Sequence, residues 1–140
     1  LVASSIQAIM AQRLVRRLCT GCKQPTTYDR KALLSVGIKP EDVKNVTFYA
    51  GAGCDRCRGR GFRGRVAVFE LMEMDTTLRE MAFRRGSVSE IRKHARSIGM
   101  ATLREDGVRK VIAGMTTIPE VLEISAKEME EEEMPAAAGG

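Results

Sequence analysis

The chain has 140 residues, of which 44% are hydrophobic and only 4% aromatic, and its formal net charge is +5. This length and composition predict one domain with an aliphatic, methionine-rich core and at most a small appendage. No apolar run reaches the length of a membrane-spanning helix, and no secretory leader opens the chain, so nothing in the sequence indicates export and we expect a soluble, cytoplasmic protein.

The first predicted element is a helix over residues 5–18, where apolar residues recur at helical spacing: Ile6, Ile9, Met10, Leu14 and Leu18. The three arginines late in this segment suit the negative end of a helix dipole. The chain opens on Leu1 without a methionine, as if inside an element. We therefore expect a piece of a larger protein.

Four cysteines follow as two CxxC pairs, Cys19 with Cys22 and Cys54 with Cys57, separated by 31 residues. Four thiolates in two such pairs are typical of a structural zinc site, whose tetrahedron they fill completely. A redox CxxC needs only one pair, and disulfides need an oxidising compartment, which nothing in the sequence indicates. We therefore predict zinc as a structural cofactor and keep redox and disulfide chemistry as alternatives.

Between and after the two pairs, the sequence predicts a short helix near Asp29–Val36, closed by Gly37, and a strand over residues 46–50. A second apolar stretch, residues 65–72, is predicted to be the partner strand. The expected unit is thus a two-stranded ribbon pinned by zinc.

Arginines crowd the second pair and the segment after it: Arg56, Arg58, Arg60, Arg63 and Arg65. Such a cluster attracts phosphate or an acidic protein surface, although a solvated loop is an equally simple interpretation. Few aromatic residues are available to stack on bases, which disfavours nucleic acid. We predict that these arginines contact a protein partner.

From Asp75 onward the sequence predicts helices. Three capping boxes recur every 15 residues, at Ser87, Thr102 and Thr117, and Gly99 and Gly114 end the first two helices. Residues 127–133 hold five glutamates and one lysine, and an Ala/Gly-rich end follows, so residues 127–140 predict a disordered tail. Without residues 127–133 the chain holds 22 basic and 13 acidic residues and is strongly basic.

The prediction is therefore an α+β fold, mostly α, in which a small zinc-pinned β-ribbon joins a bundle of short helices. Its parts are an N-terminal helix (residues 1–18), the tetracysteine module (19–72), the helical bundle (73–126) and the tail (127–140).

Two single residues, Glu70 and His94, need an interpretation of their own. Glu70 interrupts an apolar strand, and we expect a structural ion pair with Arg63 or Arg65, or else a contact with a partner. His94 is the only histidine. Because no cysteine lies near it in sequence and the four thiolates already complete the zinc site, we expect it to be packed or on the surface.

Catalytic motifs are absent from the 140 residues. There is no G-x-x-x-x-G-K-[ST] loop to cradle phosphates and no G-x-S-x-G turn to expose a nucleophilic serine. We therefore assign no catalytic residue and predict that this chain alone does not hydrolyse ATP.

Three blocks in order resemble one family, the type II secretion and type IV pilus assembly ATPases of the GspE/PilB type. They are Leu1-Val-Ala-Ser-Ser-Ile with Ala11-Gln-Arg-Leu-Val-Arg-Arg-Leu-Cys19-x-x-Cys22; Gly53-Cys-x-x-Cys57-x-Gly-x-Gly-Phe62-Arg-Gly-Arg65-x-x-x-Phe69-Glu70; and Gly99-Met-x-Thr-Leu-x-x-Asp-Gly107-x-x-Lys110-Val-x-x-Gly114-x-Thr-Thr117-x-x-Glu120-Val-Leu.

The resemblance implies a zinc module hanging from a RecA-like ATPase core that would precede Leu1 and would bind ATP and magnesium. It also implies a cytoplasmic hexamer at the inner face of the bacterial inner membrane, attached to the membrane only through a platform protein. Gln12 and Arg13 would then face the core, a nucleotide or an adjacent subunit, although ordinary helix-surface polarity explains them as well.

Two other functions stay open on the residues alone. Cys54-x-x-Cys-x-Gly-x-Gly61 matches one repeat of the zinc region of J-domain co-chaperones, which indicates a chaperone-like module. The arginine cluster beside a zinc turn also fits a nucleic-acid-binding zinc ribbon.

Overall fold

The computed structural model describes residues 8–133 of the chain. In chain order, its strands and α-helices are β1 (Ala8–Leu18), β2 (Lys23–Thr26), α2 (Arg30–Ser35), β3 (Phe48–Gly51), β4 (Phe62–Glu73), α3 (Thr76–Phe83), α4 (Val88–Ser97), α5 (Leu103–Ile112) and α6 (Ile118–Glu133). Two 3-10 turns, Pro40–Val43 and Asp55–Cys57, complete it. The predicted α+β class is confirmed.

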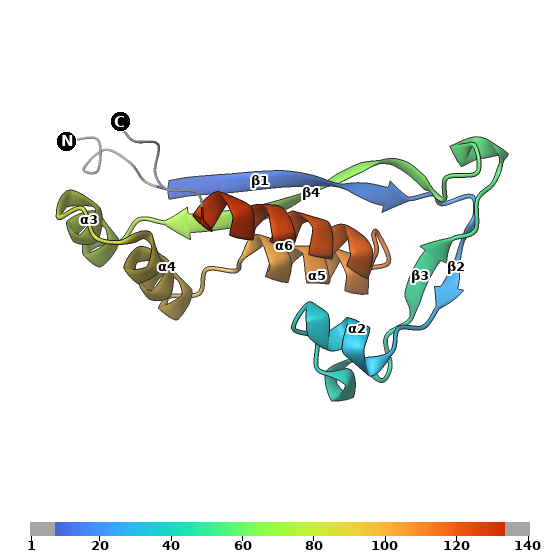
Figure 1. Ribbon diagram of the computed structural model, residues 1–140, viewed down its shortest axis with the longest axis horizontal. Helices are drawn as coiled ribbons and strands as arrows, with labels where there is room; N and C mark the ends of the chain where they lie inside the picture. Colours follow the sequence, from blue (N-terminus) through green and yellow to red (C-terminus); the bar gives the residue numbers. More distant parts are fainter. Residues whose placement is uncertain (1–7, 134–140) are drawn as a thin grey trace.

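A long antiparallel ribbon of β1 and β4 forms the spine of the molecule (Figure 1). Helices α5 and α6 lie side by side along it, α3 and α4 lie at one end, and the cysteine turns lie at the other. A second ribbon, β2 with β3, branches from the cysteine end towards α2.

The predicted helix over residues 5–18 is wrong for every residue of it that is described, because Ala8–Leu18 is a strand. Its first residues lie outside the described part. The spacing of the apolar residues fits a helix, but their burial follows the alternation of a strand. Leu14 is half exposed, whereas its neighbour Val15 is buried. Pairing with the 12-residue strand β4 decides the conformation, as tertiary contacts often override local propensity.

The predicted pairing of residues 46–50 with 65–72 is also wrong. Strand β4 pairs with β1, from Ala8 opposite Glu73 to Leu18 opposite Phe62, and β3 pairs with β2. Strand β2 was not predicted, because its four residues include Pro25 and their burial shows no alternation.

The predicted helices after Asp75 are present, and the side chains of Ser87 and Thr102 accept hydrogen bonds from the backbone N–H groups of Glu90 and Glu105. Asp29 caps α2 in the same way, and Gly37 has the positive φ expected of a helix stop. Helix α6 continues to Glu133, so the first seven residues of the predicted tail are helical rather than disordered. Glutamate is a good helix former, which explains the extension. The Ala/Gly-rich end lies outside the described residues.

Glu70 is buried and forms an ion pair with Arg92 of α4, with an Nη1 to Oε1 distance of 3.2 Å, so the predicted pairing with Arg63 or Arg65 is wrong. In a strand, residues 63 and 65 face the side opposite to residue 70, which excludes that contact. His94 is half buried, and its Nε2 lies 2.9 Å from Oδ2 of Asp75. This hydrogen bond, with one from the N–H of Leu78, lowers the pKa of Asp75.

Two apolar clusters hold the elements together. Val15 and Val68 of the long ribbon pack with Leu103 and Ile124 of α5 and α6. The same two helices also pack on the second ribbon through a larger cluster that includes Leu33, Phe48, Val111 and Val121. The α5–α6 pair therefore joins the spine to the branch that leaves the cysteine end. Among residues 8–133, none of the helices combines the length and the apolar character that a membrane span requires.

Candidate metal centre

The four cysteines lie where the two ribbons meet. Cys19 follows the last residue of β1 and Cys22 precedes the first residue of β2, while Cys54 and Cys57 lie between β3 and β4. Each CxxC pair is thus the turn by which the chain passes from one ribbon to the other. The structure brings together all four predicted ligands.

The sulfur positions suit a tetrahedral metal site. The Sγ atoms of Cys19 and Cys54 lie 3.7 Å apart, and Cys57 Sγ lies 3.8 Å from the sulfurs of both Cys22 and Cys54. All four sulfurs lie within 4.8 Å of one another. Four sulfurs at ~2.3 Å from a central zinc would be about 3.8 Å apart. This cluster could therefore hold a metal ion.

Backbone donors surround the sulfurs. The N–H groups of Gly61 and Cys54 donate to Cys57 Sγ at 3.2 and 3.3 Å, and the N–H of Gly53 donates to Cys22 Sγ at 3.3 Å. Burial opposes ionisation of Cys57, but the two donated hydrogen bonds and the neighbouring thiols lower its pKa to about 6. Burial, together with hydrogen bonds to the other thiols, raises the pKa of Cys22 to about 11. A bound divalent cation would offset part of the negative charge that four thiolates bring together.

The turns need glycine for close backbone contact. A Cβ on Gly51 would lie 2.1 Å from the carbonyl oxygen of Gly61, and that oxygen accepts a hydrogen bond from the N–H of Cys19 at 3.0 Å. Gly61 also has φ +79°, in the left-handed region that favours glycine. The end of β3 and the start of β4 can therefore touch directly behind the cysteines.

The turn between α5 and α6 anchors the centre, a role that was not predicted from the sequence. The carbonyl of Met115 accepts from the N–H of Leu18 at 2.9 Å, and that of Gly114 accepts from Lys23 Nζ at 3.1 Å. Thr116 Oγ1 donates to the carbonyl of Arg16 at 2.8 Å. The sequence signal was the Gly114-x-Thr-Thr segment, which we interpreted only as a helix stop and cap.

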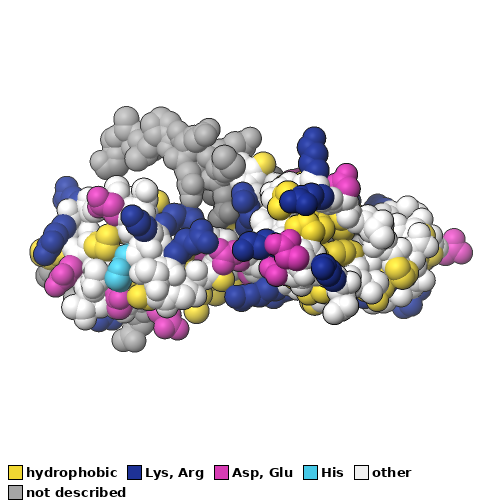
Figure 2. Space-filling view, turned by 90° about the horizontal axis from the view of Figure 1, so that it is seen from below, with side chains coloured by type: hydrophobic (Ala, Val, Ile, Leu, Met, Phe, Trp, Pro, Cys, Tyr) yellow, Lys and Arg dark blue, Asp and Glu magenta, His cyan; other side chains and the backbone are white. Residues whose placement is uncertain are grey.

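The five clustered arginines are all exposed, and none has an ion pair within the described residues. Three lie on the second cysteine turn and two in the first half of β4. The helical side seen in Figure 2 differs, because acidic side chains lie among its lysines and arginines. Gln12 and Arg13 are neighbours on β1 and so face opposite sides of the ribbon, with Gln12 exposed. They do not form a common site.

Comparison with known proteins gives one consistent family. Residues 1–123 match the family described as Type II/IV secretion system protein. The chain is 42% identical over 123 residues to the type IV pilus assembly ATPase PilB of Myxococcus xanthus, covering 87% of this chain and 22% of that protein. It is 38% identical over 128 residues to the type II secretion system protein E of Pseudomonas aeruginosa, covering 91% and 25%. The chain therefore spans about a quarter or less of the length of these relatives.

Proposed function

Because the chain belongs to the Type II/IV secretion system protein family, we propose that it is the C-terminal zinc-binding part of a secretion or pilus-assembly motor ATPase. The remainder of such a protein would supply ATP and magnesium binding, since the 140 residues contain no phosphate loop. In this proposal the motor is a cytoplasmic hexamer on an inner-membrane platform protein. The cysteine cluster is the observation that carries the proposed role.

Zinc is the proposed ion. The donor set is four thiolates, which zinc prefers and which leave no position open for water or substrate. The role is therefore structural, and the relevant question is which parts of the chain the metal joins. The cysteines connect both ribbons at one point, and both ribbons pack on α5 and α6.

The proposed mechanism is mechanical. Movement of the long ribbon would be passed through the metal centre to the second ribbon and to the exposed arginines around it. Structural zinc contributes about 10–16 kcal/mol in small modules, whereas closing a 31-residue loop costs roughly 3 kcal/mol. The metal centre would therefore stay assembled while the motor exerts force on the ribbons.

The test uses a full-length motor that contains this chain. Replacing Cys54 and Cys57 together by serine should abolish pilus or secretion output while the hexamer still hydrolyses ATP. Loss of hydrolysis and hexamer assembly along with output would argue that zinc holds the motor together rather than transmitting its motion. Unchanged output in a zinc-free variant would contradict any role of the centre in coupling.

A further inference from the structure

The free edge of strand β4 is open along part of its length. The N–H of Phe69 points away from β1, since it donates to Oδ2 of Asp106 in α5 at 2.9 Å. In an antiparallel pair, alternate residues direct both backbone groups outward. Leu71 and Glu73 therefore also present N–H and C=O groups to this edge, and within the described residues nothing bonds to them.

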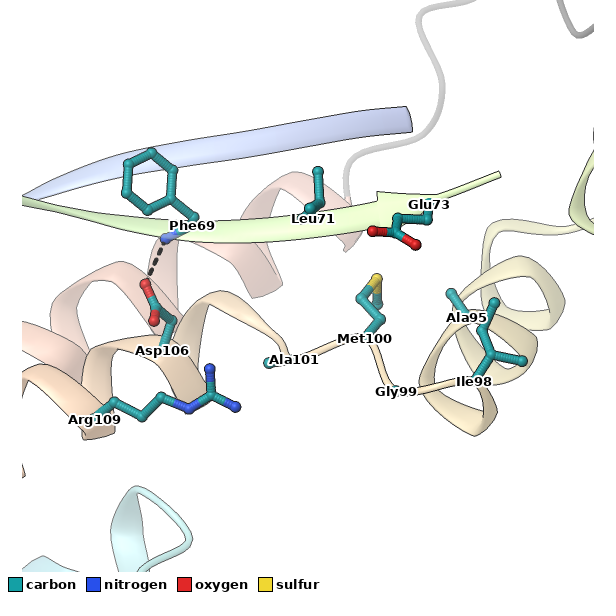
Figure 3. A pocket seen from close by; sticks show the side chains of 10 residues that line it. All are labelled: Phe69, Leu71, Glu73, Ala95, Ile98, Gly99, Met100, Ala101, Asp106 and Arg109. Carbon is teal, nitrogen blue, oxygen red and sulfur yellow. Dashed lines mark hydrogen bonds between the residues drawn. The ribbon is translucent and has the colours of Figure 1, made fainter. Parts of the chain in front are cut away.

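A cavity of about 380 Å³ lies beside this open edge (Figure 3). One wall is the β4 segment from Phe69 to Glu73, and the opposite wall is the end of α4 and the link to α5, which contributes Ile98, Met100 and Ala101. In Figure 3 the side chains of Phe69 and Leu71 lie on the other side of the strand from Met100. The cavity is thus bounded by the strand's backbone edge, by small or apolar residues of the α4–α5 link, and by charged side chains at its ends.

We propose that this edge binds an extended peptide segment of a partner protein, which adds to β4 as a third, antiparallel strand. Such a strand would bond to the outward groups of Leu71 and Glu73. Its residues opposite Glu70 and Met72 would face the same side as those residues and enter the cavity. Apolar side chains fit there, beside Met100.

The charges at the two ends of the cavity define the partner further. Arg109 of α5 lies at the Asp106 end, is exposed and has no ion pair within the described residues. Glu73 lies at the other end and is likewise exposed and without an ion pair there. An antiparallel segment would therefore carry a basic residue opposite Glu73. Its acidic residue would follow the last paired residue, where Asp106 ends the pairing and the segment leaves the edge and can turn towards Arg109. Asp106 occupies the edge position at Phe69 and limits the added strand to a few residues.

The test is a titration of the isotope-labelled, zinc-loaded 140-residue chain with the capped peptide Lys-Val-Thr-Val-Asp at millimolar concentration. Amide resonances of Leu71, Glu73 and Met100 should shift. Leu71→Pro removes the outward donor without touching the bonds to β1, and should weaken binding about tenfold or more. Leu14→Pro makes the same change on the outer edge of β1 and should leave binding unchanged.

Absence of shifts with the wild-type chain would overturn the proposal, as would equal binding by Leu71→Pro or equal weakening by Leu14→Pro. If Leu71→Pro does not fold, Arg109→Glu tests the same site. The wild-type chain should prefer the peptide ending in Asp to Lys-Val-Thr-Val-Lys, and Arg109→Glu should reverse that preference, whereas Lys93→Glu should not. A preference unaffected by Arg109→Glu would overturn the proposal. The inference does not depend on the proposed motor function.

Discussion

The carboxylate of Glu120 in α6 binds both the backbone N–H and the side chain of Arg16 in β1. Oε2 of Glu120 accepts from the backbone N–H of Arg16 at 2.8 Å, and Oε1 accepts from Nε at 2.9 Å. Glu120 is buried, while the Arg16 side chain is largely exposed and lies over the ring of Phe62. The hydrogen bond to Glu120 raises the pKa of Arg16. This contact fixes the end of β1, just before the first cysteine.

Replacing Glu120 by alanine should destabilise the zinc-loaded chain by about 1–3 kcal/mol, because the N–H of Arg16 loses its acceptor in a partly buried place. Glu120→Gln keeps an acceptor and should cost less. Urea unfolding measures both. Glu80→Ala is the matched control, since Glu80 makes only an exposed contact with Arg84 at 4.0 Å, worth ~0–1 kcal/mol. Equal costs for Glu120→Ala and Glu80→Ala would contradict the anchoring role.

The chain should bind one zinc ion with Cys19, Cys22, Cys54 and Cys57 as the ligands. The sulfurs are already spaced as a tetrahedral thiolate site requires. Metal analysis of protein made in zinc-replete medium should give a ratio near one, and Cys54→Ser should lose the metal to a chelator much faster. Thr20→Ser, in the first cysteine turn, should retain it. Four free thiols with negligible zinc would disprove this prediction.

Chelation should loosen the cysteine turns, β2 and β3, and leave the β1–β4 ribbon with α5 and α6 protected. The long ribbon has its own apolar cluster, which includes Val15, Val68, Leu103 and Ile124 and needs no metal. Hydrogen exchange with and without chelator measures this division. Uniform loss of protection over residues 8–133 would show instead that the metal supports the whole fold.

The sequence was sufficient for the parts of the fold that local chemistry decides. The caps at Asp29, Ser87 and Thr102 are short-range hydrogen bonds, and each predicted helix after them is present. The cysteine cluster was equally readable, because two CxxC pairs have few other uses. These predictions did not require knowing which helices and strands pack against one another.

Strand pairing could not be predicted from the sequence, because it depends on contacts between residues that are far apart in the chain. Ala8–Leu18 meets the spacing of a helix and the alternation of a strand only loosely, and β4, some fifty residues later, decides between them. The predicted partner of Glu70 was wrong for the same reason, since Arg92 comes from another element. The metal ligands could be predicted, but the α5–α6 turn that anchors them could not.

Gly51→Ala should weaken zinc retention and destabilise the cysteine end. The new Cβ would meet the backbone of Gly61, which has no free rotation to escape, and overpacking of this kind costs about 1–3 kcal/mol. A chelator competition assay and urea unfolding measure the two effects. Gly21→Ala is the control in the same region, because its Cβ would meet the flexible side chain of Arg56 at 3.0 Å and the sulfurs of Cys54 and Cys19 only at ordinary van der Waals distances of 3.5 and 3.6 Å. A Gly51→Ala chain with normal zinc retention would refute the close contact.

Charge reversal of the exposed arginine cluster should impair the full-length motor without affecting the metal. Arg60 and Arg63 are exposed beside the cysteine turn and have no ion pair within the described residues, and guanidinium groups suit acidic protein surfaces. We expect the acidic contact to come from another molecule. Arg60→Glu with Arg63→Glu should reduce pilus or secretion output while zinc content and melting temperature stay normal. Arg30→Glu with Lys31→Glu makes the same change of charge on α2 and should be tolerated.

Normal output from the chain with Arg60→Glu and Arg63→Glu would remove the partner role of the arginine cluster. Tight, salt-dependent DNA binding by the wild-type chain would assign the cluster to nucleic acid instead.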